Sequence, residues 1–183
     1  MKGRKILIGI LAIVLLLAAA FFYFNYRNRT LSPPGNETLT SGGITVSVSY
    51  SRPSVRGRVI FGSEDQNALQ PYGKYWRLGA NEATEVTFNR DILFNGSPVK
   101  AGTYTMYAIP GPESFEVALN SETDRWGARE PDYDLDVLHT KVPVEKISAP
   151  VEQYTISLAP AGDGINMIFE WSDVRFVVPL KVQ

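Results

Sequence analysis

The sequence predicts an all-β domain, an antiparallel β-sandwich of jelly-roll-like or similar topology, preceded by one transmembrane helix. Two observations carry this prediction. A single long apolar run occupies residues 6–24, and from Ile44 onward apolar and polar residues alternate repeatedly with a period of two. A chain of 183 residues has room for one domain and an appendage.

The apolar run from Ile6 to Phe24 reads ILIGILAIVLLLAAAFFYF. As a helix it would span roughly 28 Å, close to the hydrocarbon thickness of a bilayer. A cleavable signal peptide is the alternative, because the small residues of a cleavage site are present at residues 18–20. Since the run is long for a signal peptide and continues through Phe24, we expect residues 1–24 to be a retained anchor.

Basic residues predict the orientation of this helix. Lys2, Arg4 and Lys5 precede the apolar run, whereas Arg27 and Arg29 follow it. This modest excess favours a cytoplasmic N-terminus. We therefore expect a single-pass protein of the cell inner membrane with a periplasmic C-terminal domain. The sequence contains no cysteine, which excludes disulfides, thiol chemistry and a lipid-modified cysteine.

The charge of the predicted domain argues against a nucleic-acid partner. Beyond residue 43 the chain has 13 Lys and Arg and 18 Asp and Glu, so its net charge is near −5. Proteins that bind nucleic acids need a basic face to displace counterions. We expect the membrane, through residues 6–24, and an envelope or integral-membrane protein as partners, and no nucleic acid.

Residues 25–43 are predicted to be a linker. The segment is polar and contains Pro33-Pro34-Gly35 and Gly42-Gly43, which interrupt regular structure. The domain is accordingly expected to occupy residues 44–183.

Alternating stretches within residues 44–183 predict half-buried antiparallel strands. They are Ile44–Tyr50, Phe115–Leu119, Tyr154–Leu158, Ile165–Trp171 and Val174–Val182. Asn95-Gly96 and Ala161–Gly164 are turn signals, and Ser172-Asp173 is expected to turn a last hairpin. About eight short strands would form two packed sheets or a closed barrel, and we favour the sandwich.

Several segments of the chain resemble a bacterial family catalogued as domain of unknown function 2911. They are Ser51–Arg58, Pro71–Thr84, Ala101–Tyr104, Ile109–Gly111, Trp126-Gly127 and Glu170-Trp171. The resemblance covers nearly all of residues 44–182 and implies a secreted or envelope-located domain without an established activity. Two departures from the family pattern are a longer connection between Gly62 and Pro71, and Leu78 in place of a small or polar residue.

The segment from Trp76 to Glu82 is a candidate ligand site. Trp76 offers a stacking face, Arg77 a bidentate fork for carboxylate or phosphate, and Asn81 and Glu82 directional hydrogen bonds. The structural alternative, which we favour, places Trp76 in the core, pairs Arg77 with Glu82, and gives Asn81 a role in a tight turn.

Arg52, Arg56 and Arg58 lie close together in the sequence and could form an anion-binding loop with Arg77. More often such a cluster is a solvated loop that pairs with nearby acids, and residues 64–65 supply two of them. We prefer the solvated loop and keep Arg52 and Arg56 as candidate ligand-binding residues.

Acidic residues recur at every second position in the segment Glu130, Asp132, Asp134 and Asp136. On an extended strand their carboxylates would share one face and could bind calcium, which prefers several oxygen ligands. The spacing does not fit an EF-hand loop, so a solvated acidic loop is the preferred interpretation. Asp132, Asp134 and Asp136 stay as weak calcium candidates, and we expect no resident metal or cofactor.

His139 is the single histidine, and we interpret it as an exposed or half-exposed strand residue. Metal sites usually need several His or Cys ligands, and the sequence contains no G-x-S-x-G motif. Without a catalytic set, the sequence favours a non-enzymatic, membrane-anchored module that docks onto a larger membrane or envelope complex. The alternative is an exoplasmic binder of small ligands or carbohydrate, or a hydrolase, that uses residues 76–82.

Overall fold

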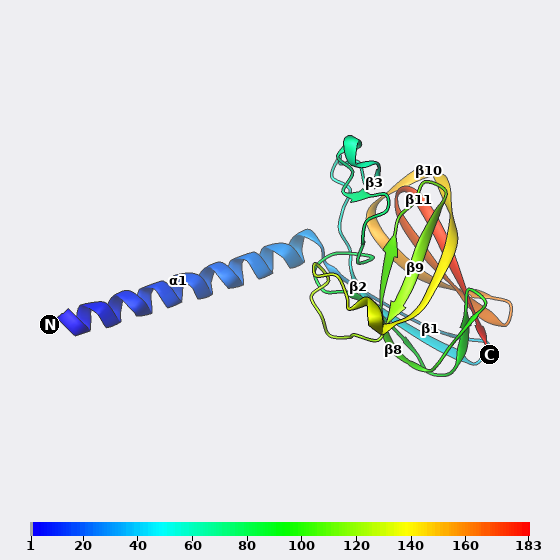
Figure 1. Cartoon of the computed structure of the whole chain (residues 1–183), viewed down its shortest axis with the longest axis horizontal. Coiled ribbons are helices and arrows are strands. Elements are labelled where there is room, and N and C mark those ends of the chain that lie inside the picture. Colours follow the sequence, from blue (N-terminus) through cyan, green and yellow to red (C-terminus); the bar gives the residue numbers. More distant parts are fainter. Residues whose placement is uncertain (1) are drawn as a thin grey trace.

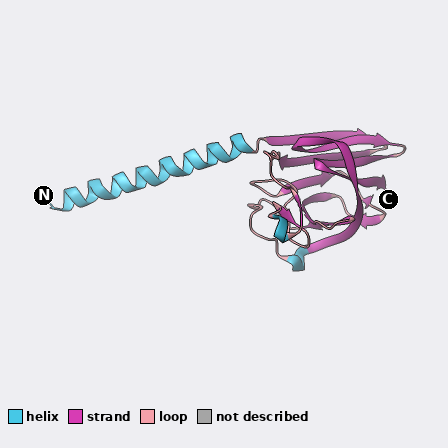
Figure 2. Cartoon of the chain, turned by 90° about the horizontal axis from the view of Figure 1, so that it is seen from above, coloured by secondary structure: helices cyan, strands magenta, loops and turns pink. Residues whose placement is uncertain are grey.

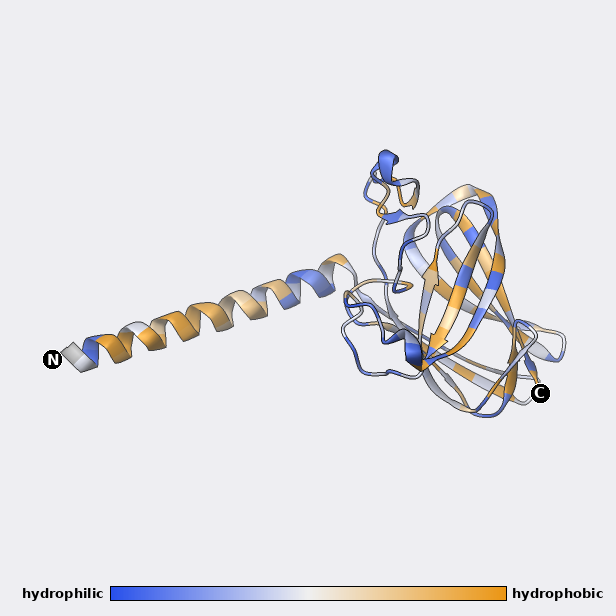
Figure 3. Cartoon of the chain, viewed as in Figure 1, coloured by the Kyte–Doolittle hydropathy of each residue, from blue (hydrophilic) through white to orange (hydrophobic). Residues whose placement is uncertain are grey.

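Helix α1 (Lys2–Leu31) projects from one end of a β domain, as the computed structural model of residues 2–183 shows (Figure 1). Its 30 residues correspond to about 45 Å of helix. The apolar side chains along it are exposed, and the hydropathy colouring shows a mostly apolar stretch between hydrophilic residues near the start and near the end of the helix (Figure 3). By length and composition this helix is able to cross a membrane.

The prediction of a linker over residues 25–43 is wrong. Helix α1 continues to Leu31, and strand β1 (Pro34–Ser41) follows after two residues. The last helical turns are supported by side chains four residues apart, since the Arg29 Nε donates to Asn25 Oδ1 and the Thr30 hydroxyl donates to the Tyr26 carbonyl. The domain therefore begins at β1, upstream of residue 44.

The domain is built from strands and two short 3-10 helices. The strands are β1 (Pro34–Ser41), β2 (Ile44–Ser51), β3 (Phe61–Gly62), β4 (Gln70–Pro71), β5 (Thr84–Phe88), β6 (Ile92–Phe94), β7 (Ser97–Val99), β8 (Gly102–Ile109), β9 (Ser114–Asn120), β10 (Asp136–Ala161) and β11 (Gly164–Val182). The 3-10 helices are η1 (Glu64–Gln66) and η2 (Tyr133–Leu135). The prediction of an all-β domain behind one apolar helix is confirmed.

The sheet has the strand order β1-β2-β5-β8-β9-β10-β11-β6-β7, and all its neighbours are antiparallel. Strand β10 pairs first with β9, through Asp136–Pro143, and then with β11, through residues 144–161. This long strand thereby joins two layers into a sandwich-like arrangement that is not closed (Figure 2). The short parallel pair β3-β4 stands apart, next to the helix end of the domain (Figure 1).

The last hairpin differs from the prediction. Residues 164–182 form one strand, β11, and Ser172-Asp173 does not reverse the chain. Instead Ser172 has a φ of 55°, and the pairing of β10 with β11 shifts register around Val151 and Ser172. The extra residues, 147–150 and 152–154, lie in β10, so β10 is the bulged strand, and its pairing with β11 resumes on either side of the bulge.

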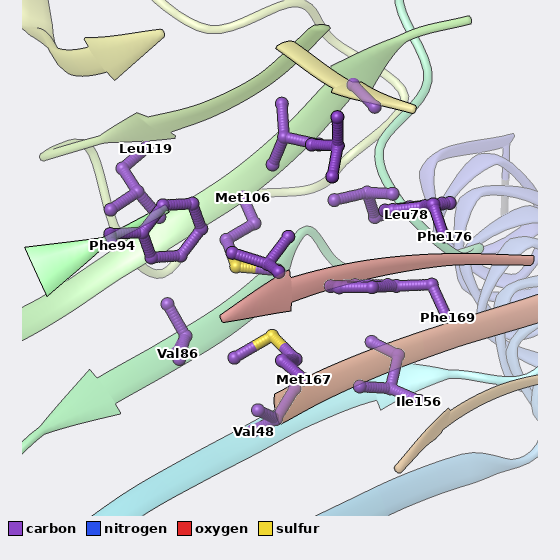
Figure 4. Packing of buried hydrophobic residues seen from close by; sticks show 14 of the residues in the cluster. Val48, Leu78, Val86, Phe94, Met106, Leu119, Ile156, Met167, Phe169 and Phe176 are labelled. Atoms are coloured by element: carbon purple, nitrogen blue, oxygen red, sulfur yellow. The ribbon is translucent and has the colours of Figure 1, made fainter. Parts of the chain in front are cut away.

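The core lies between the layers and is rich in aromatic side chains. Figure 4 shows Met106 and Met167 among Phe94, Phe169 and other apolar side chains. Towards the helix, Trp76 is 1% exposed and stacks on Trp171 with ring centroids 5.9 Å apart. The structural interpretation of Trp76 as a core residue is thus the one that its burial supports.

Candidate functional site

The end of α1 is docked on the domain through polar contacts, and we call this junction the helix foot: residues 28–32 together with the loops 53–58 and 77–82. Arg29 forms an ion pair with Glu82, at 2.5 Å between Nη2 and Oε1. The Arg56 Nη2 donates to the Leu31 carbonyl at 2.9 Å, and the Asn81 amide donates to the Ser32 carbonyl at 3.3 Å. The contacts satisfy carbonyls that a helix end leaves free.

The 53–58 loop is shaped by its own arginines. Arg56 has a φ of 51° and Gly57 a φ of 68°, which turn the chain back. The Arg58 guanidinium donates to the carbonyls of Ser54 and Val55, at 2.6 and 3.0 Å. The Val55 amide donates to the Glu152 carbonyl, which ties the loop to β10. Both guanidinium groups are consequently held beside the end of α1.

The 77–82 loop passes close under β2. A Cβ on Gly79 would lie 2.7 Å from the Ser51 carbonyl oxygen, so a side chain does not fit there. Leu78 has a positive φ of 52° and is fully buried, and its carbonyl accepts a hydrogen bond from the Thr84 hydroxyl at 2.6 Å. The apolar residue that departs from the family pattern is therefore a core residue.

Arg77 extends from this loop over the Trp126-Gly127 segment. A Cβ on Gly127 would lie 2.8 Å from the Arg77 Cδ, so glycine makes room for the arginine stem. The Gly127 amide donates to the Asn81 carbonyl, and the Arg77 Nη1 donates to that carbonyl at 3.4 Å. Burial lowers the pKa of Arg77, and the nearby Arg125 adds to this effect, while Tyr75 opposes it.

A cavity of about 250 Å³ lies at the helix foot, between α1 and the two loops. Arg56, Arg58 and Arg77 line it, together with the side of Trp171 and the helix residues Asn28 and Leu31. No aspartate or glutamate is among its lining residues, so the cavity presents positive charge and amide groups.

The candidate residues Arg52 and Glu82 lie outside this cavity lining and make contacts within the fold. The Arg52 guanidinium donates to the Tyr154 carbonyl and the Thr155 hydroxyl, at 3.3 and 3.0 Å, and lies outside the cavity lining. The expected pairing of Arg77 with Glu82 is wrong, because the Glu82 carboxylate pairs with Arg29 instead. Sequence spacing could not reveal this, since the helix was expected to end before Arg29.

The acidic run is not arranged as a metal site. The helix η2 interrupts the extended chain, so Asp132, Asp134 and Asp136 do not share a face. Asp132 accepts from the Asp134 amide, whereas Asp136 accepts from Tyr107 and Asn120. Within residues 2–183 no group of three or more His, Cys, Asp or Glu is placed to hold a metal ion.

A hydrogen-bonded network around His139 escaped the sequence reasoning. The His139 Nδ1 lies 2.7 Å from Glu116, and its Nε2 lies 2.9 Å from Asp136. Tyr107 donates to the same Asp136 at 2.6 Å. Burial opposes protonation of His139, but the hydrogen bonds to Glu116 and Asp136 raise its pKa above the ordinary value. The pairing of β9 with β10 brings Glu116 close to His139, and no local sequence motif predicts this contact.

Comparison with known proteins identifies the family of the chain. Residues 32–180 match the family model described as "Protein of unknown function (DUF2911)", and because this covers most of the chain, the protein belongs to that family. The match begins directly after α1, where the structure also places the start of the domain. No curated protein and no solved structure matches the chain significantly.

Proposed function

For this member of the DUF2911 family, we propose a non-enzymatic role as a membrane-tethered binding module, an accessory subunit that docks onto a larger membrane or envelope complex. Residues 6–24 cross the inner membrane, the N-terminus is cytoplasmic, and the β domain is periplasmic. The basic residues before the apolar run support this orientation.

The docked helix foot is the observation that carries the proposal. Only residues 32–33 separate α1 from β1, and three polar contacts hold the helix end against the domain. A module that captures soluble ligands gains from a flexible tether, whereas a fixed orientation suits a partner that is itself fixed in the membrane. The partner that we propose is therefore an integral membrane protein.

Exposed apolar side chains surround the helix foot. Trp126 is 49% exposed and shares an apolar recess with Phe21 and Phe24 of α1. Val59 and Leu69, joined by a backbone hydrogen bond, are exposed on the β3-β4 lobe that stands beside the helix (Figure 1). Aromatic and aliphatic side chains at this level suit the membrane boundary and the flank of a neighbouring membrane protein.

The geometry gives less support to a carbohydrate binder or hydrolase at residues 76–82. Trp76 is buried and offers no face for stacking on a sugar. The Glu82 carboxylate is held by Arg29, and Glu85, which lines the same pocket together with Asp124, accepts a hydrogen bond from the Asp124 amide. Hydrolysis of a glycosidic bond generally uses two carboxylates flanking the bond.

Site-specific cross-linking tests the docking. A photo-reactive residue at Leu69 in the full chain, activated in intact membranes, is expected to form one discrete adduct with a membrane protein. The same residue at Val137, which is 47% exposed against 38% for Leu69 but lies on β10, is the control and should form none. Equal adducts from both positions, or none from Leu69 in folded protein, would contradict the docking.

The topology is tested separately. Protease added outside spheroplasts should digest the β domain. The measured mass of the chain purified from membranes should be that of the full chain, with residues 1–24 included. Digestion only after lysis would reverse the orientation, and a new N-terminus near Phe21 would show that the apolar run is a signal peptide.

A further inference from the structure

The cavity at the helix foot is lined by three arginines whose guanidinium groups form no ion pair within the described chain. Arg56, Arg58 and Arg77 make hydrogen bonds only to carbonyl groups through their guanidinium groups. None of the three guanidinium groups lies within 4 Å of a carboxylate in residues 2–183, whereas those of Arg29, Arg125, Arg129 and Arg175 each do. The nearby acids Glu64 and Glu152 are used elsewhere, by Lys74 and by the Arg56 backbone amide.

The guanidinium groups also retain free hydrogen-bonding capacity. Each guanidinium has five N–H donors. Arg56 and Arg77 each use one of theirs, and Arg58 uses two. Burial of Arg77 lowers its pKa, which indicates that its charged form is incompletely solvated. An anion between the three side chains would compensate that charge and occupy the unused donors.

The size of the cavity limits what fits. At about 250 Å³ it is smaller than the roughly 300–1,000 Å³ that drug-sized ligands occupy. It suits one compact anionic group. The planar fork of arginine matches phosphate oxygens bidentately, and three arginines line this cavity.

The position of the cavity along α1 indicates where such a group would come from. Asn28 and Leu31 line the cavity and follow Phe24, the last residue of the apolar run, by about 6–10 Å along the helix axis. The headgroup layer extends about 5–8 Å beyond the hydrocarbon on each side. This depth argument rests on the membrane-spanning topology proposed above.

We propose that the cavity formed by Arg56, Arg58 and Arg77 binds a phosphate group at the membrane surface, supplied either by an anionic phospholipid headgroup or by free phosphate. Binding clamps the end of α1 to the domain, because Arg56 already donates to the Leu31 carbonyl and Arg77 to the Asn81 carbonyl. The ligand thereby stabilises the orientation of the domain on the membrane.

Phosphate binding is first measured without a membrane. The full chain in non-ionic detergent is titrated with inorganic phosphate at constant ionic strength, with chloride as the reference, and its Tm is followed. A saturable rise in Tm is expected. Arg58→Gln and Arg77→Lys should weaken the apparent affinity about tenfold, because each loses charge-assisted hydrogen bonds. Arg90→Gln, the same loss of charge near the β1-β2 turn, should respond like the wild type.

Nanodiscs then distinguish the two sources. If the headgroup is the ligand, phosphatidylglycerol should raise the Tm above that in phosphatidylcholine and abolish the response to added phosphate. If free phosphate is the ligand, the response should be the same in both lipids.

Two results would overturn the proposal. One is a Tm that does not respond to phosphate or to phosphatidylglycerol. The other is an equal loss of apparent phosphate affinity in Arg90→Gln and Arg58→Gln. Arg58 lies on an exposed loop, so its variant keeps the test valid even if Arg77→Lys folds poorly. The detergent titration requires neither the topology nor a protein partner, so its failure is separable from failure of the proposed function.

Discussion

Two arginine clusters lie near the end of the domain that faces α1, and they differ in how their charge is compensated. In the 121–130 loop, Arg125 and Arg129 both approach Glu122, and Arg125 also donates to the Tyr75 hydroxyl at 3.0 Å. At the helix foot, Arg56, Arg58 and Arg77 bond only to carbonyl groups. The first cluster has its counter-ion within the chain, although the buried Arg125 Nε lacks a hydrogen-bond partner, whereas the guanidinium groups of the second have no carboxylate partner.

The proposal of a ligand at the helix foot makes this difference one between arginines that serve the fold and arginines that serve binding. Arg125 is 7% exposed, and a guanidinium this deeply buried requires a counter-ion from the protein itself. The helix-foot arginines face a cavity that a ligand can enter. If this distinction is correct, disturbing the first cluster should alter stability, and disturbing the second should alter the response to anions.

The largest effect on stability is expected from Glu122→Gln. Removing this carboxylate leaves Arg125 as a buried charge without its partner. The loss should be about 2–3 kcal/mol, below the roughly 3–5 kcal/mol of fully buried pairs because Glu122 is 24% exposed. Chemical unfolding of the detergent-solubilised chain measures it. A loss as small as that of exposed substitutions would remove the contrast between the clusters.

Arg77→Met should behave in the opposite way. In buffer without polyvalent anions it should change the free energy of unfolding by less than about 1 kcal/mol, because the charge removed has no carboxylate partner. The rise in Tm with phosphate should disappear. A large destabilisation independent of phosphate would assign Arg77 to the structural class.

Double-mutant cycles test which arginine is the ion-pair partner of Glu82. Arg29→Gln and Glu82→Gln should couple by about 0.2–1 kcal/mol, as exposed ion pairs do. The matching cycle of Arg77→Gln with Glu82→Gln should give a smaller coupling. Stronger coupling to Arg77 than to Arg29 would mean that the helix end is not docked as described.

The smallest effect concerns His139 on the side of the domain. Its folded-state pKa is raised, so its contribution to stability is complete below the unfolded pKa of about 6.5 and is lost as pH rises through the folded pKa. Since the side chain is 45% exposed, the contribution should not exceed about 1 kcal/mol. Relative to His139→Gln, the wild type should lose this advantage between mildly acidic and alkaline pH. A constant difference across that range would contradict the network.

Local patterns in the sequence predict much of this fold but not its junctions. Alternation identifies β2, β9 and the strands around the core, because each buries one face. It could not identify β1, whose residues are largely polar and which is an edge strand held by its pairing with β2. Pro34 is tolerated there because an edge strand does not need every ladder hydrogen bond.

The helix foot was only partly foreseen for a similar reason. The sequence brings Arg56 and Arg58 together and suggests Arg77 as their neighbour. The role of α1 in completing the cavity depends on contacts between Arg29 and Glu82 and between Arg56 and Leu31, which are distant in the sequence. Such contacts become visible only once the helix is known to continue past Phe24.

Depth measurement is the most direct test of the central claim, that the β domain is held with its arginine cavity at headgroup level. Because the chain contains no cysteine, single nitroxide labels can be placed at Leu69→Cys in the cavity lining and at Asp163→Cys in the β10-β11 turn. In nanodiscs, relaxation by oxygen and by a water-soluble nickel complex should place the label at position 69 at the headgroups and the label at position 163 in water. If both labels are equally accessible from water, the domain is not held at the membrane surface and the account is wrong.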